Sequence, residues 1–120
     1  MGILAAPLLM LDLTHEIEQV RSEGHWQSGH TARPLAKYPD LRLVLIVMKA
    51  GGRLEKHRAE GRILVQPLDG RIRFNTEELS VELGVGQMLT LEAGVFHDVE
   101  GIVDSAFLLT IAWRKESSNP

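Results

Sequence analysis

The sequence contains no cysteine, which excludes disulfide bonds and thiolate metal sites and gives no sign of an oxidising compartment. It also lacks a basic excess: 13 Lys and Arg residues stand against 16 Asp and Glu residues, a net charge of −3. Nucleic-acid-binding domains usually carry a basic stripe, and none is visible here. We therefore expect a cytoplasmic protein that does not bind nucleic acid.

No apolar run is long enough to cross a membrane. The apolar start, MGILAAPLLML, is interrupted by Pro7 and has no Lys or Arg before Arg21, unlike a signal peptide. We therefore expect no membrane association and interpret this segment as an apolar strand. The chain also has no phosphate-cradling glycine loop, no nucleophile elbow and no Ser/His/Asp grouping.

What the sequence does contain is typical of one folded domain. It has 120 residues, of which 44% are apolar, enough for a single core. Leu13, Ile17 and Val20 recur at helical spacing, with Asp12 or Thr14 as the N-cap and Gly24 as the stop. This pattern predicts one short N-terminal helix.

Almost everything after residue 31 has the pattern of short strands. Residues 33–38 and 42–49 flank a Pro-Asp turn, and residues 43–48 are apolar at every position, so both faces of that strand should be buried. Residues 63–68 and 71–76 are predicted to form a two-residue hairpin across Asp-Gly. Further strands are predicted at residues 79–83, 87–91, 95–100 and 106–113. Many short strands separated by turns favour an all-β sandwich or barrel.

The five histidines are the main candidates for catalytic or metal-binding side chains. Three belong to the helix or the segment after it, His15, His25 and His30, and their roles are open. His57 and His97 lie on or beside strands, each a few residues after a glycine turn.

The segments around these two histidines, GGRLEKHRAEGRILVQPLDG and GQMLTLEAGVFH, resemble the two motifs of the cupin superfamily. Gly51, His57 and Gly70 match the first motif, and the second is matched by Gly86, Gly94 and His97. The spacing between the motifs is short, as in small bacterial cupins. The resemblance implies a double-stranded β-helix, the jelly-roll or RmlC-like cupin barrel, preceded here by a short helix.

This sequence departs from the family pattern at four positions. The second histidine of the first motif falls on Ala59 and the glutamate on Ile63, while the proline and asparagine of the second motif fall on Glu92 and Gly101. Metal-binding cupins hold zinc, iron, manganese or nickel with three histidines and that glutamate, so only His57 and His97 remain as metal ligands, with the third unknown. Its candidates outside the family positions are Glu60, Glu92, Gln66, His25 and His30.

The remaining features carry weaker predictions. His97 and Asp98 are adjacent on a strand, so their side chains should point to opposite faces and form no dyad. Trp26 and Trp113 could line the pocket, but a core or dimer-interface position is favoured. Lys56 and Arg58 should point away from the face that carries His57.

We divide the chain into residues 1–30, an N-terminal strand and helix packing on the barrel; residues 31–114, the barrel; and residues 115–120, a polar tail. The favoured function is a non-catalytic cupin, a homodimer, that holds a small organic ligand in its lumen against His57, Ile63 and His97. Two alternatives stay open: a metal-dependent oxygenase or isomerase with an incomplete histidine site, and a dimeric interaction or scaffold domain. Whether the protein is an enzyme stays open.

Overall fold

A computed structural model describes residues 4–24 and 29–113, which form one helix and nine strands. The elements are α1 (Leu13–Glu23), β1 (His30–Lys37), β2 (Leu41–Met48), β3 (Arg53–His57), β4 (Arg62–Asp69), β5 (Arg71–Asn75), β6 (Ser80–Gly84), β7 (Leu89–Leu91), β8 (His97–Gly101) and β9 (Ser105–Ala112).

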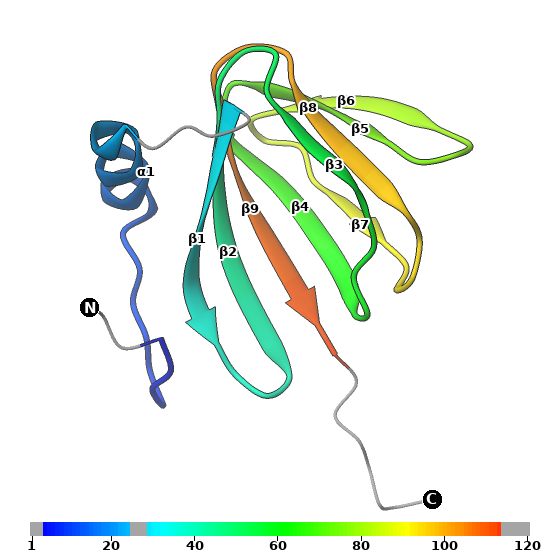
Figure 1. Ribbon diagram of the computed structural model, residues 1–120. Coiled ribbons are helices and arrows are strands. Elements are labelled where there is room, and N and C mark those ends of the chain that lie inside the picture. Colours follow the sequence, from blue (N-terminus) through cyan, green and yellow to red (C-terminus); the bar gives the residue numbers. More distant parts are fainter. Residues whose placement is uncertain (1–3, 25–28, 114–120) are drawn as a thin grey trace, which may run out of the picture.

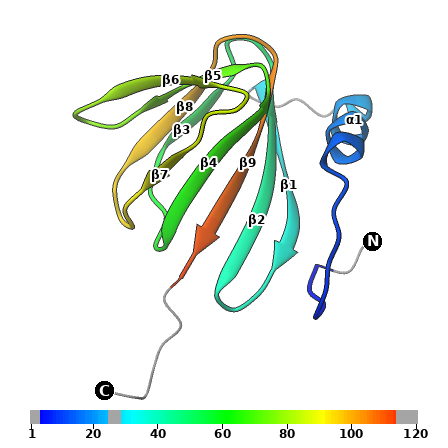
Figure 2. The ribbon, with the colours of Figure 1, turned by 180° about the vertical axis from the view of Figure 1, so that it is seen from behind.

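The strands form two antiparallel sheets that face each other, as Figures 1 and 2 show from opposite sides. The five-stranded sheet has the order β1-β2-β9-β4-β7, and the four-stranded sheet has the order β3-β8-β5-β6. Strands distant in sequence, such as β2 and β9, are neighbours, as expected of a jelly roll. The predicted all-β barrel with one short N-terminal helix is confirmed.

The helix begins after Asp12, one of the two predicted N-caps, and ends at Gly24 as predicted. The Asp12 side chain accepts a hydrogen bond from the His15 backbone N–H at 3.1 Å, which caps the first turn. Gly24 ends the helix in the left-handed conformation, with φ of 71°. Ile17 and Val20 form the buried face of α1.

Both faces of β2 are buried, as its unbroken apolar run predicts, but by different layers. Ile46 and Met48 point between the two sheets and belong to the main core, with Phe107. Leu45 and Val47 point to the other face, where α1 covers them. The helix is therefore a third layer outside the five-stranded sheet.

The predicted hairpin across Asp69 and Gly70 is wrong. Strand β4 pairs with β7 and β9, whereas β5 pairs with β6 and β8, so the two segments belong to different sheets. Gly70 has φ of 80°, and a side chain there would collide with the Asp104 carbonyl and the Ser105 hydroxyl. Asp69 and Gly70 therefore form a corner at which the chain passes from one sheet to the other, packed against Ser105. An Asp-Gly pair between two strands is also typical of a hairpin, which is why the sequence predicted one.

The expected N-terminal strand is absent from residues 4–12, which the structure describes without a strand. This segment still contacts the end of β1: the Lys37 N–H donates to the Leu4 carbonyl at 2.7 Å, and the Tyr38 hydroxyl donates to the Ala6 carbonyl at 2.9 Å. Within the described residues, no helix has the length and apolar character to span a membrane. The polar tail predicted at 115–120 lies outside the described residues.

Candidate functional site

The fold brings His57 and His97 together. They face each other as register partners at the junction of β3 and β8, with ring centroids 4.4 Å apart and ring planes tilted by 58°. The pairing depends on a β-bulge, since three steps from Leu54 to His57 lie opposite two steps from Val99 to His97. In a regular ladder Lys56 would oppose His97, so the extra residue turns His57 into the barrel.

Each imidazole is held by its own backbone. The Nδ1 atom of His57 lies 2.7 Å from the Glu55 carbonyl oxygen, and Nδ1 of His97 lies 3.0 Å from the Val95 carbonyl oxygen. A carbonyl can only accept, so Nδ1 carries the proton in both rings. In the neutral state both Nε2 atoms are therefore hydrogen-bond acceptors or metal ligands available to the pocket.

His97 is the more deeply set of the two, with 4% of its surface exposed, whereas His57 is exposed at the pocket mouth. The ring of His97 stacks on Phe74, with centroids 5.1 Å apart and planes tilted by 15°. Burial lowers the pKa of His97 below its usual value of 6.5, and the neighbouring His57 acts in the same direction. The hydrogen bond to the Val95 carbonyl and the charge of Asp98 oppose this shift. The net effect favours neutral His97.

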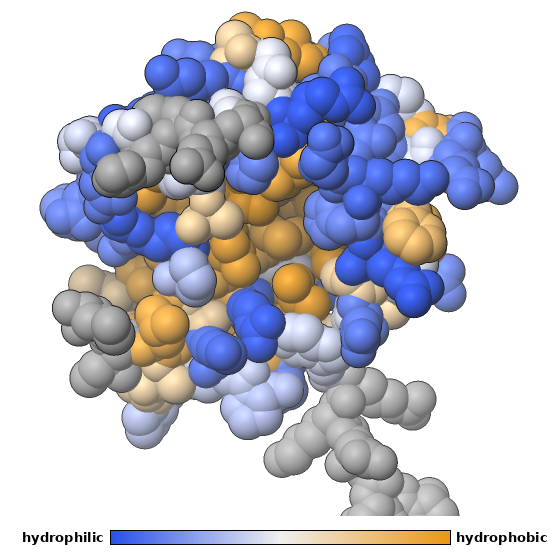
Figure 3. All heavy atoms as spheres, viewed as in Figure 1, coloured by the Kyte–Doolittle hydropathy of each residue, from blue (hydrophilic) through white to orange (hydrophobic). Residues whose placement is uncertain are grey.

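The two histidines line a pocket of about 260 Å³ at one end of the barrel. Its lining comes from both sheets and from the loop after β3: Arg42, His57, Arg58, Ala59, Glu60, Ile63, His97, Leu109, Ile111 and Trp113. Figure 3 shows apolar surface in the middle of the molecule between hydrophilic residues. The wall formed by the five-stranded sheet is mainly apolar.

All three residues predicted to bind a ligand lie at this pocket, and so does Ala59. Ile63 is 1% exposed and points from β4 into the core, so a branched hydrocarbon occupies the family's glutamate position. Ala59 packs against the same core from the loop after β3. Their contact with a ligand stays a prediction.

Sequence reasoning missed Arg42. It points inward, because it alternates along β2 with Val44 and Ile46, which face the main core. Its guanidinium carbon lies 5.1 Å from the ring centroid of Trp113. The strand pattern held a usable signal, namely a charged residue in register with inward apolar positions.

The predicted position can be checked for only one of the two tryptophans. Trp113 follows β9 and lines the pocket, so the favoured core or dimer-interface position does not describe it fully. Trp26 lies outside the described residues, as does His25.

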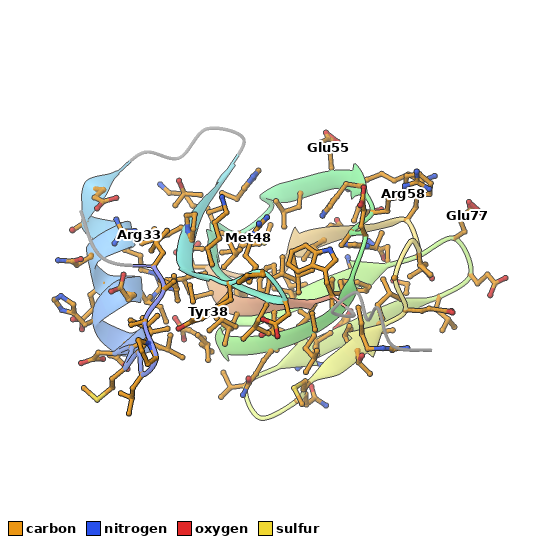
Figure 4. All side chains as sticks on the ribbon, turned by 90° about the horizontal axis from the view of Figure 1, so that it is seen from below. Arg33, Tyr38, Met48, Glu55, Arg58 and Glu77 are labelled. Atoms are coloured by element: carbon orange, nitrogen blue, oxygen red, sulfur yellow. The ribbon has the colours of Figure 1, made fainter. Side chains whose placement is uncertain are left out.

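The contacts confirm the opposite faces of His97 and Asp98, whereas Arg58, which was predicted to point away from the face of His57, also lines the pocket. The Asp98 carboxylate accepts from Asn75 at 2.7 Å on the face opposite His97. Lys56 and Arg58 lie over the ring of Phe96, at 5.6 and 5.2 Å from its centroid. Figure 4, viewed from below, shows Glu55 pointing away from the barrel and Arg58 at its periphery.

A divalent metal does not fit the described residues well. They contain no group of three His, Cys, Asp or Glu side chains that could hold an ion. Zinc and iron sites usually draw at least three protein ligands. The apolar side chain of Ile63 also disfavours an uncompensated ion.

The proposed third ligands lie in several places. Glu60 lines the pocket, while Glu92 and Gln66 are exposed and absent from its lining. His30 pairs with Met48, at the end of β2 opposite to Arg42, and is remote from the pair. His15 is exposed on α1.

Comparison with known proteins gives matches in structure alone. No protein-family model and no curated protein matches the sequence. A conserved protein of unknown function from Streptococcus pyogenes superimposes with a TM-score of 0.74 and 22% identity, covering 95% of each chain.

Two further solved structures name the fold and one activity found on it. A cupin superfamily protein from Desulfitobacterium hafniense has a TM-score of 0.69 and 16% identity, over 73% of this chain and 81% of that one. A variant of oxalate decarboxylase from Bacillus subtilis has a TM-score of 0.66 and 21% identity, over 78% of this chain and 28% of that one. Identities this low establish the fold and leave the activity open. The protein is a small, single-barrel chain with the cupin fold.

Proposed function

We propose that the protein binds a small organic molecule in the pocket beside His57 and His97, without catalysing a reaction. The observation that carries this proposal is the pairing of two fixed imidazole acceptors with an apolar wall in one concave site. Ligand pockets commonly combine such a wall with a few placed polar groups. At about 260 Å³ the space suits a molecule smaller than a typical drug, for which pockets measure roughly 300–1,000 Å³.

The non-catalytic part of the proposal rests on the shared orientation of the two imidazole rings. A reaction in which a substrate is both protonated and deprotonated needs one group that donates a proton and another that accepts one. Both imidazoles hold Nδ1–H against a backbone carbonyl, so in the neutral state both present an acceptor. Such a pair is suited to receiving hydroxyl or N–H donors of a ligand.

The test is native mass spectrometry of the untagged protein, followed by ligand-observed NMR against a fragment library. We expect bound organic molecules that are lost in the variant Ala59→Phe, because the larger side chain would fill the pocket. The matched control is Ala93→Phe, at an exposed loop position outside the pocket lining. Equal binding by both variants, or none by the parent protein, would refute the proposal.

A second candidate is a metal-dependent enzyme in which His57 and His97 hold zinc, iron, manganese or nickel with one further ligand. The single observation in its favour is that both Nε2 atoms are available. Metal analysis of the untagged protein decides it, because a tight site should be close to fully occupied. Metal at less than about a tenth of an equivalent per chain would contradict it.

We also propose that the chain forms a homodimer, and a cytoplasmic location stays a prediction. Support for pairing comes from the N-terminal segment, where Leu8 and Met10 are 83% and 85% exposed beside β1, an edge strand. Light scattering after size exclusion should give twice the chain mass of 13.4 kDa.

The scaffold alternative is tested by the variants His57→Ala and His97→Ala. If both variants behave like the parent protein in cells, that result favours a scaffold role over ligand binding.

A further inference from the structure

The eight arginines of the described residues fall into three groups by their partners. Five of them pair with carboxylates: Arg21, Arg33, Arg53, Arg71 and Arg73. Arg62 donates to the Thr90 hydroxyl. Arg42 and Arg58 have no carboxylate partner within residues 4–24 and 29–113, and both line the histidine pocket.

These two arginines differ in direction. The guanidinium of Arg58 lies over Phe96, on the outer side of the loop after β3. Arg42 is on the inward face of β2, and its guanidinium lies over Trp113. The Arg42 Nε atom is buried and meets no acceptor among the described atoms. The Nε atom is closed to solvent, so a ligand would meet the other guanidinium nitrogens of this half-buried side chain, which lines the pocket and has no carboxylate partner among the described residues.

The charges around the pocket favour an anion. Arg42 and Arg58 contribute two positive charges, and Glu60, on the exposed loop, contributes one negative charge. With both histidines neutral, the lining has one excess positive charge. Planar guanidinium groups bind carboxylates through two parallel N–H···O bonds, and stacking on an aromatic ring orders the guanidinium for this contact.

The polar groups of the pocket therefore include both hydrogen-bond donors and hydrogen-bond acceptors. Arg42 offers donors and a positive charge, whereas His57 and His97 offer Nε2 acceptors. Ile63, Leu109 and Ile111 supply the apolar surface in the same pocket. A matching ligand has a carboxylate, a hydroxyl donor and a small apolar body.

We propose that the pocket is selective for small hydroxycarboxylic acids, with the carboxylate at Arg42 and the hydroxyl at the histidine pair. This inference rests on the proposed ligand-binding function and specifies its ligand class. It assigns Arg42 the role of the specificity-determining residue and each histidine that of a hydroxyl acceptor.

The test uses isothermal titration calorimetry with the three hydroxybenzoate isomers, lactate and 3-hydroxybutyrate. Each acid is paired with its primary amide, which lacks the charge, and benzoate serves as the analogue without a hydroxyl. At least one acid should bind about tenfold or more tightly than its amide, as expected of a charge-assisted hydrogen bond. Arg42→Gln should remove that preference by weakening binding of the acid far more than binding of the amide, and a circular dichroism spectrum like that of the parent protein shows that the variant is folded.

Arg62→Gln is the matched control, because Arg62 lies on β4 outside the pocket lining. It should leave every affinity unchanged. If acids and amides bind the parent protein equally, or if Arg42→Gln keeps the preference for acids, the carboxylate assignment is overturned while ligand binding stands. If no compound of the panel binds, the hydroxy-acid inference is overturned, and the fragment experiment on Ala59→Phe still decides the proposed function.

Discussion

His57 and His97 face each other at 4.4 Å between ring centroids, yet they have different surroundings. His97 is buried against Phe74, while His57 is exposed at the mouth. Burial disfavours the charged form of His97, and the neighbouring His57 acts in the same direction. The protein therefore stabilises His97 in its neutral form, and this has a consequence for folding.

We expect the free energy of unfolding to fall as the pH is lowered from 7.5 to 5, partly because of His97. Its pKa is lowered in the folded protein, so below about pH 6.5 the unfolded chain binds a proton that the folded chain does not. The stability from neutral His97 is present above that pH and is lost as the pH falls toward the folded pKa. Urea denaturation of His97→Gln at several pH values should show a shallower pH dependence than the parent protein.

The same substitution at His15, which is exposed on α1, is the control and should leave the slope unchanged. The comparison is between slopes, so a general loss of stability in His97→Gln does not affect it. Identical slopes for His97→Gln and the parent protein would contradict the assignment of this effect to His97.

The sequence predicted which histidines form this site better than it predicted the directions of the side chains around them. The resemblance of the two segments to the cupin motifs was sufficient to place His57 and His97 at one pocket. The β-bulge before His57 was not predictable from the alternation of side chains along a strand. Alternation assumes a regular strand, and the extra residue reverses the direction of every side chain after it. Arg42 was missed because the unbroken apolar run begins at residue 43, although Arg42 shares the inward face of Val44.

The error at Asp69 and Gly70 has a different physical origin. A short Asp-Gly step between two strands specifies a sharp reversal, but it does not specify which strands pair. Contacts between residues distant in sequence decide which strands pair. Here β4 pairs with β9, and β5 pairs with β8. The local pattern therefore predicted the turn and its strands correctly but assigned them to the wrong partners.

Gly70→Ala should destabilise the protein by about 3 kcal/mol or more, since left-handed strain and a collision add together. The added carbon would meet the Asp104 carbonyl and Ser105. Gly24→Ala is a matched control, because Gly24 also has a positive φ, of 71°, but has nothing within 4 Å of the added carbon. It should cost only about 1–2 kcal/mol. Thermal and urea denaturation measure both, and equal losses would argue against close packing at the corner.

Ser105→Ala tests the hydrogen bonds at the same corner. The Ser105 hydroxyl accepts from the Arg71 N–H at 3.0 Å, and its oxygen also lies 2.9 Å from the Arg71 carbonyl. Ser105 is fully buried, so its removal should leave polar groups unpaired and lower the free energy of unfolding by about 1–3 kcal/mol. Ser80→Ala, at an exposed position on β6, should change it by less than about 0.5 kcal/mol. A neutral result at Ser105 would mean that water replaces the hydroxyl.

Val20→Ala tests whether α1 is a true third layer of the fold. Val20 is 1% exposed and packs with Leu45 and Val47 on the outer face of β2. Arg33 of β1 also pairs with Glu16 and Glu23 of the helix, and Figure 4 shows its position beside α1. These contacts require the helix to be docked.

Loss of the two Val20 methyl groups should lower the free energy of unfolding by about 1–3 kcal/mol, since both transfer and cavity costs apply. Glu18→Ala, on the exposed face of the same helix, should change it by less than about 0.5 kcal/mol. Urea denaturation followed by fluorescence measures both variants. If Val20→Ala is as stable as the parent protein, the helix does not cover the outer face of β2 in solution, and the apolar residues there would need another cover, such as a second copy of the chain.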